Sequence, residues 1–132
     1  MQPRSKNLPQ PRSKSKTGTL GESLAASYLS SHHFHILEHN YRAGYGEIDI
    51  IAKEGNTLVF VEVKTRANTL YGAPEDSVSP QKLFTVTQTA QMYMQSHPKS
   101  YASIRIDVIA IMLKLADNSV VSLKHFRNVS GG

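Results

Sequence analysis

Cysteine is absent from the 132 residues of this chain. Its absence excludes a disulfide framework, a thiolate zinc site and a cysteine nucleophile. No apolar run approaches the roughly 18 residues that a membrane span requires, and the basic N-terminus lacks the apolar segment of a signal peptide. We therefore expect no membrane contact and take the cytoplasm as the default location. A chain of this length can bury its own core, which predicts a single domain.

Basic residues are scarce outside the first residues of the chain. Five of the fifteen lysines and arginines lie within residues 1–16, where there is no acid, and the rest of the chain carries ten basic and ten acidic side chains. We predict a disordered basic tail over residues 1–17, because Pro, Ser and Lys offer too little apolar surface to offset the entropy of ordering. Residues 18–132 would form the folded domain. The tail fits a solubilising extension and a nucleic-acid-holding arm equally well.

Apolar periodicity and turn residues predict two helices and five strands. The helices are expected at residues 19–31 and from Ser79-Pro80 to about residue 95, and the strands at 35–42, 47–52, 58–65, 104–113 and 120–126, with a loop at 68–76. Thr19 and Glu22 have the spacing of a capping box, which would explain a glutamate there without any metal. The order of elements indicates an α/β fold with a central mixed sheet flanked by helices.

The second and third strands are predicted to form a hairpin around a Gly55-Asn56 turn. In that register Asp49 lies opposite Glu62, and Glu47 lies opposite Lys64. Because side chains alternate along a strand, these four polar side chains share one face. The other face is expected to carry Ile48, Ile50, Val59, Val61 and Val63.

Two acids directly opposite each other repel, so the pair Asp49 and Glu62 needs a compensating charge. Mg²⁺ prefers oxygen ligands, is held by one or two carboxylates and keeps several waters, and Mn²⁺ accepts similar ligands. A neighbouring lysine can orient an attacking water or stabilise developing charge. The alternative is a solvated sheet face on which Glu47 pairs with Lys64, and the carboxylate spacing alone does not decide between the two.

Two segments, GEIDII at 46–51 and FVEVKTR at 60–66, resemble the YraN family of small bacterial proteins. The resemblance covers roughly residues 18–127 and includes Gly21-Glu22, SVSPQK at 77–82 and RIDV at 105–108. It implies a restriction-endonuclease-like fold with an αβββαβ core, similar to archaeal Holliday-junction resolvases. It also implies a Mg²⁺-dependent endonuclease that hydrolyses phosphodiester bonds of DNA, including branched or damaged DNA.

The same resemblance implies roles for individual residues. Asp49 and Glu62 would bind the metal, the main-chain carbonyl of Val63 would complete the site, and Lys64 would be the catalytic lysine. Glu22 would reach this site from the first helix, a reading that competes evenly with its capping role.

The resemblance further implies that Gly46 permits a close approach before the hairpin and that Glu47 supports Lys64. The family's second helix tends to be rich in Arg and Lys, whereas here Lys82 is its only basic residue. Binding of nucleic acid, with DNA favoured over RNA, would then depend on the tail or on basic residues gathered near the cleft. The candidates for this group are Arg42, Lys53, Arg66, Lys82 and Arg105.

Other readings remain beside the nuclease. One alternative is a non-catalytic nucleic-acid-binding protein that retains the fold, and another is a protein-interaction module with a solvated acidic surface. Junction cleavage would favour a homodimer. A zinc site at His32, His33, His35 and His39 is less expected than surface histidines, since no diagnostic spacing is present. For Tyr41, Tyr45 and Tyr71, packing is a commoner fate than stacking on bases.

Overall fold

The computed structural model describes residues 16–67 and 78–130. The predicted loop at 68–76 lies outside them, as does the predicted tail apart from its last two residues, which begin the first helix. In chain order the elements are α1 (Lys16–Ser31), β1 (Phe34–Ala43), β2 (Gly46–Glu54), β3 (Thr57–Arg66), α2 (Pro80–Ser96), β4 (Ser103–Leu113) and β5 (Val120–Phe126). The predicted elements are confirmed to within a few residues of their bounds.

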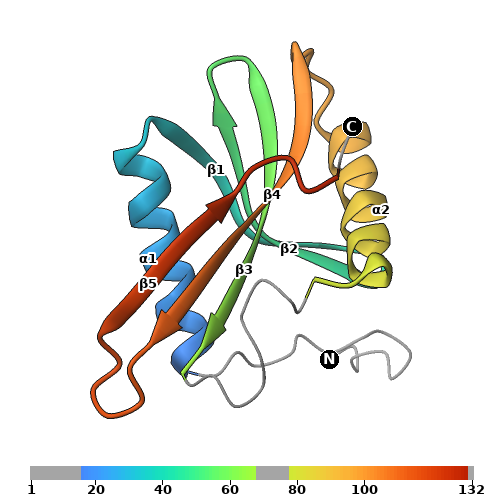
Figure 1. Cartoon of the computed structure of the whole chain (residues 1–132). Helices are drawn as coiled ribbons and strands as arrows, with labels where there is room; N and C mark the ends of the chain where they lie inside the picture. Colours follow the sequence, from blue (N-terminus) through green and yellow to red (C-terminus); the bar gives the residue numbers. More distant parts are fainter. Residues whose placement is uncertain (1–15, 68–77, 131–132) are drawn as a thin grey trace, which may run out of the picture.

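The strands form one mixed sheet in the order β1-β2-β3-β4-β5. All neighbours are antiparallel except β3 and β4, which are parallel and are connected through α2. The two helices lie on opposite sides of the sheet (Figure 1), and each covers its own apolar cluster. This arrangement confirms the α/β class and is consistent with a restriction-endonuclease-like core, with β5 added at one edge. Neither of the two described helices has the length and apolar character needed to cross a membrane.

Helix α2 begins at the predicted signal. The hydroxyl of Ser79 accepts a hydrogen bond from the backbone N–H of Lys82 at 3.1 Å, and Pro80 occupies the first turn. The hydroxyls of Thr85, Thr87 and Thr89 each donate to the carbonyl four residues earlier. These bonds satisfy threonines that otherwise disfavour a helix interior. The start of α2 consequently fixes Lys82 in its first turn, on the side that faces the sheet.

Helix α1 begins earlier than predicted, at Lys16. Thr19 therefore lies inside the helix and is not its N-cap, so the predicted capping box is wrong. Glu22 loses its predicted capping role, because it lies in the second turn of α1 and not in the first. The adjacent Gly21 is buried against Thr65 of β3, whose hydroxyl occupies the space that a Cβ would need. A larger residue at position 21 would push α1 off the sheet.

The hairpin of β2 and β3 has the predicted register, but over only part of its length. Glu54 pairs with Thr57 around the Gly55-Asn56 turn, where Gly55 has a φ of 60°. Pairing then continues to Ile50 and Val61, where it ends. The expected pairs further along, Asp49 with Glu62 and Glu47 with Lys64, are therefore not formed as backbone pairs.

Strict alternation along β2 also breaks near this point. Ile50 packs in the cluster under α1, whereas Ile48 packs under α2 with Ile51. The prediction that Ile48 and Ile50 share one face of the sheet is therefore wrong. The break coincides with Asn40 of the neighbouring β1, which has a left-handed φ of 52° between the pairs formed by its neighbours His39 and Tyr41. A kink shared by β1 and β2 turns the start of β2 toward α2.

Candidate active site

Asp49 lies where β2 leaves β3. Its Oδ2 accepts a hydrogen bond from the backbone N–H of Val63 at 2.8 Å, just beyond the last backbone pair, Ile50 with Val61. Figure 1 shows β2 turning away from β3 and running toward α2. The carboxylate thus serves as the partner of a β3 N–H that the departing strand no longer satisfies. This bond places the buried Asp49 beside Val63 and its neighbours on β3.

Glu62 is the most deeply buried acid of the site, with 2% of its surface exposed. Its Oε2 lies 3.2 Å from Nζ of Lys82 in the first turn of α2. Its Oε1 is buried and has no hydrogen-bond partner within the described part of the chain. A buried carboxylate oxygen without a partner costs free energy in either protonation state, and most native structures avoid it. This oxygen is suited to a ligand that the protein itself does not supply.

The electrostatics of the site favour a proton or a cation on Glu62. Burial raises the pKa of Glu62 to about 7, and the negative charge of Asp49 adds to the increase, while Lys82 and Lys64 oppose it. Burial also lowers the pKa of the Lys64 ammonium, against the attraction of Glu62. The charges of Asp49, Glu62 and Lys64 thus act on one another across the site.

Lys82 lies at this site, and its partner there was not predicted. The sequence analysis named Lys82 among the basic residues that would hold nucleic acid near the cleft, whereas the structure pairs it with Glu62. The signal for this position was present in the sequence. The Ser79-Pro80 helix start fixes residue 82 in the first turn, and a parallel β3-α2-β4 crossover returns that turn to the sheet.

The donor set fits a hard divalent cation held by few protein ligands. Residues 16–67 and 78–130 contain no group of three His, Cys, Asp or Glu side chains that could bind a metal together. Two carboxylates, Asp49 and Glu62, are what Mg²⁺ typically takes from a protein when waters and substrate phosphates complete its shell. The unpaired Oε1 of Glu62 supports this fit. Coordination by the carbonyl of Val63 stays a prediction.

Glu22 and Glu47 form a second acidic pair, which Asn40 joins. With the Asn40 amide turned so that its nitrogen faces the acids, that nitrogen donates to Glu47 at 3.2 Å and to Glu22 at 3.0 Å. Arg42 lies 3.9 Å from the other oxygen of Glu47. The structure does not bring Glu22 into one metal-binding group with Asp49 and Glu62. Glu47 pairs with Arg42 of β1, and its predicted support of Lys64 stays a prediction.

Of the predicted nucleic-acid-binding residues, two lie at the acidic site. Lys82 contacts Glu62, and the positive charge of Arg66 acts on Lys64 from the end of β3. Arg42 lies beside Glu47, and Lys53 lies near the hairpin turn, opposite Leu58. The expectation that Arg105 lies near the cleft is wrong, because Arg105 pairs with Glu54 and Asp107.

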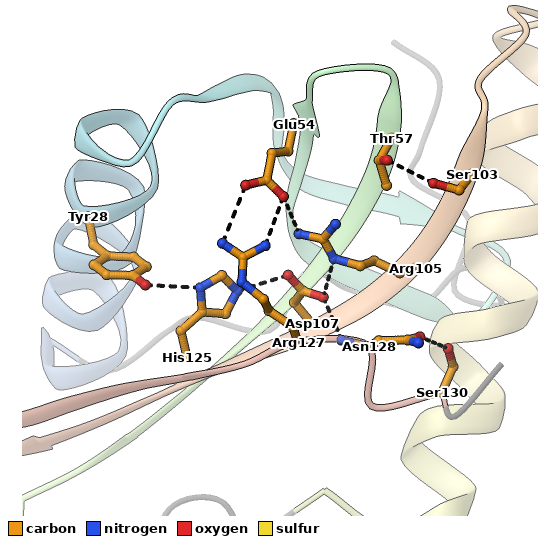
Figure 2. A network of polar contacts seen from close by, with 10 residues as sticks. All are labelled: Tyr28, Glu54, Thr57, Ser103, Arg105, Asp107, His125, Arg127, Asn128 and Ser130. Carbon is orange, nitrogen blue, oxygen red and sulfur yellow. Dashed lines mark hydrogen bonds and ion pairs between the residues drawn. The ribbon is translucent and has the colours of Figure 1, made fainter.

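Arg105 belongs to a buried polar network on the α1 side of the sheet (Figure 2). Its guanidinium donates to Glu54 at 2.7 Å and to Asp107 at 2.9 Å, and only 17% of its side chain is exposed. Arg127 also pairs with Glu54, at 2.8 Å. Glu62 and Lys64 face α2, so Arg105 lies on the opposite face from the acidic site.

Asp107 is the centre of this network and was missed as a site of importance. It is fully buried and accepts hydrogen bonds from Arg105, from the backbone of Asn128 and from His125, which in turn contacts the hydroxyl of Tyr28. Burial raises the pKa of the carboxyl, but the bonds from His125, Arg105 and Asn128 bring it below its usual value. The sequence signal was a single acid within the apolar run at 104–113.

The remaining candidates have ordinary positions. Tyr41 packs edge-on against Tyr93 with ring centroids 5.1 Å apart, as expected for a core tyrosine. Tyr71 lies outside the described residues. The histidines at 32–39 do not converge on a metal site within the described ranges. Tyr45 is almost fully exposed.

Comparison with known proteins gives a family. Residues 21–111 match the family described as "Uncharacterised protein family UPF0102". A UPF0102 protein of Syntrophus aciditrophicus is 46% identical over 99 residues, which cover 75% of this chain and 78% of that protein. Another, from Geotalea daltonii, is 43% identical over 111 residues, which cover 84% of this chain and 86% of that protein. A third, from Mycolicibacterium vanbaalenii, is 34% identical over 118 residues, 89% of this chain and 96% of its own. The matched range contains Asp49, Glu62, Lys64 and Lys82.

Proposed function

This chain belongs to the UPF0102 family, which confirms its resemblance to YraN, and we propose that it is a metal-dependent nuclease acting on DNA. One observation carries the proposal, namely that a buried glutamate, Glu62, has an oxygen with no partner beside a second buried acid, Asp49. If Glu62 were purely structural, both of its carboxylate oxygens would be expected to have hydrogen-bond partners, or an apolar residue would stand in its place. A solvated sheet face does not explain it, since 2% of Glu62 is exposed.

Asp49 and Glu62 would hold the cation, with Mg²⁺ or Mn²⁺ as the ions of suitable chemistry. When bound, the ion polarises a phosphate oxygen and lowers the pKa of a coordinated water. Asp49 keeps its orientation through its bond to Val63. Glu62 releases its proton near neutrality, because its pKa of about 7 lies close to physiological pH.

Lys64 and Lys82 supply the positive charges of the site. Lys64 projects from β3 two residues after Glu62, and burial lowers its pKa without removing its attraction to the acids. An ammonium in that position can orient an attacking water and stabilise charge that develops on the phosphate. In the metal-free protein, the positive charge of Lys82 compensates the negative charge of ionised Glu62. Once a cation takes over that balance, Lys82 and Arg66 are available to contact backbone phosphates.

The test is a titration of Mg²⁺ and of Mn²⁺ against labelled DNA and RNA, each as single strands, duplexes and junctions. We expect metal-dependent cleavage by the wild-type protein and at least about a hundredfold slower cleavage by Asp49→Asn, since removal of a group that stabilises the transition state costs several kcal/mol. Asp117→Asn is the matched control, because it makes the same chemical change at an exposed turn.

The outcomes separate the candidate functions. Cleavage that survives Asp49→Asn would reject this centre. Tight binding of nucleic acid without any cleavage in either metal would establish the alternative, a non-catalytic nucleic-acid-binding protein. If the protein neither binds nucleic acid nor shows a thermal shift with Mg²⁺ or Mn²⁺, the remaining candidate is a protein-interaction module.

A further inference from the structure

A hollow of about 500 Å³ lies between the turn that joins β1 to β2 and the outer face of α2. One wall is the turn itself, from Gly44 to Gly46. The other wall carries Gln88, Gln91 and Gln95, which recur at intervals of three and four residues and therefore share one side of the helix. We call this hollow the glutamine groove.

The turn is held close to the helix by glycine. Gly46 is buried against Thr89, whose hydroxyl fills the place of a Cβ, and the end of the Met92 side chain lies 3.2 Å from the place of a Cβ on Gly44. These contacts fix the distance between the two walls. The groove is thus a feature of the packed structure and does not depend on the position of a single long side chain.

The chemistry of the groove is polar but uncharged. Among the described residues that line it, none is an Asp, Glu, Lys, Arg or His. The glutamine amides provide donors and acceptors, and at the tip of the turn the ring of Tyr45 is 92% exposed. A phosphate would find no cation here. A nucleobase is neutral and planar, carries donors and acceptors at its edge, and stacks on aromatic rings.

The groove and the acidic site lie along the same two elements, α2 and β2. Thr85, in its helical wall, lies one turn after Lys82, and Gly46 lies three residues before Asp49 on β2, a distance of about 10 Å along a strand. A strand whose phosphate sits at Asp49 and Glu62 would therefore bring a neighbouring nucleotide to the groove.

We propose that the glutamine groove binds one unpaired nucleobase next to the phosphate that is cleaved, so that the substrate carries a single-stranded segment. The inference rests on the proposed function and names its substrate class: single strands, flaps, gaps or open junctions. In a continuous duplex each base is stacked on both faces and paired along its edge, which leaves no ring face for Tyr45 and no Watson–Crick edge for a glutamine.

The experiment measures binding of the full chain to oligonucleotides in EDTA, where cleavage cannot interfere. Each oligonucleotide is single-stranded or duplex and carries 2-aminopurine, whose fluorescence is quenched when it stacks. We expect tighter binding to the single strand, with quenching. Tyr45→Ala should weaken that binding between about fivefold and a hundredfold and abolish the quenching, because loss of one base–aromatic stack typically has an effect of this size. Gln88→Ala should weaken it several-fold.

Two controls keep the test specific. Tyr45→Phe retains the ring and should bind as the wild type does. Leu115→Ala removes another exposed apolar side chain, on the β4–β5 turn, and should have no effect. Equal binding by wild type, Tyr45→Ala and Gln88→Ala, or equal affinity for duplex and single strand, would overturn the inference. If Glu62→Gln loses cleavage but still quenches 2-aminopurine, the result supports base binding in the groove. If the wild type binds the base in the groove but cleaves nothing, only the proposed nuclease function has failed.

Discussion

The carboxylate of Asp49 accepts a hydrogen bond from the backbone N–H of Val63, 2.8 Å away, at the point where β2 and β3 stop pairing. One side chain therefore has two functions. It satisfies a backbone donor that the divergence of the strands would leave unpaired, and it fixes the orientation of an acid in the candidate metal site. The two functions can be separated, because an amide oxygen can accept the same bond but binds a divalent cation far less well.

Asp49→Asn should leave the free energy of unfolding in EDTA within about 1 kcal/mol of the wild-type value, since the bond to Val63 can persist and repulsion from Glu62 is removed. Asp49→Ala should lower it by about 1–3 kcal/mol, because the Val63 N–H loses its partner. Both variants should lose the stabilisation that Mn²⁺ gives the wild type. Urea unfolding with and without Mn²⁺ measures this, and equal destabilisation by both variants would contradict the role of the bond.

The stability of the metal-free protein should fall as pH rises between about 4.5 and 7. In the folded protein the pKa of Glu62 is about 7, above its ordinary value of 4.5, so the folded state holds this proton more tightly than the unfolded chain does. Raising the pH through this window deprotonates the unfolded state first and favours it, by about 3 kcal/mol at most. Glu62→Gln should remove the dependence and be more stable than the wild type at pH 8. Parallel pH profiles for the two proteins, measured by urea unfolding, would argue against a raised pKa.

Metal binding should show the opposite dependence on pH. The cation requires the ionised carboxylate, so affinity for Mn²⁺ should rise with pH up to about 7 and level off above it. Calorimetry between pH 5.5 and 8.5 measures the curve. A flat curve would mean that Glu62 is not a ligand.

Lys82→Met should raise the pKa of Glu62 further, because the positive charge of Lys82 lowers it in the wild type. The pH at which Mn²⁺ affinity levels off should then move upward. Lys114→Met makes the same change at an exposed lysine outside the site and should leave the curve unmoved. If both variants behaved as the wild type does, the contact of 3.2 Å between Lys82 and Glu62 would have no energetic consequence.

Asp107→Asn should destabilise the protein by about 3–5 kcal/mol, since it removes the charge that compensates Arg105 in a buried network. The cleavage rate per folded molecule should be unchanged, because the network faces α1 and the acidic site faces α2. Thermal unfolding together with activity below the melting temperature tests both parts. Loss of activity in fully folded Asp107→Asn would show that the two faces are coupled.

The order and type of the elements were predictable from the sequence because they depend on local chemistry. Ser79-Pro80 favours a helix start ahead of an apolar stripe, and Gly55-Asn56 favours a hairpin turn, each through its own backbone and side-chain chemistry. The apolar run at 104–113 was suited to a buried strand, and β4 is buried over most of its length. The register of the hairpin followed from the turn, and with it the association of Asp49 with Glu62 and Lys64.

Tertiary structure decided what local chemistry could not. Divergence of β2 from β3, the shared kink at Asn40 and the packing of α2 bring Lys82 to Glu62, while they keep Glu22 with Glu47 and move Ile48 to the other face. Arg105 and Lys82 look equivalent in sequence, yet one is enclosed in ion pairs and the other faces the acidic site. The sequence determines which side chains a strand or helix carries, but the partner of a charge depends on which elements the core packs together.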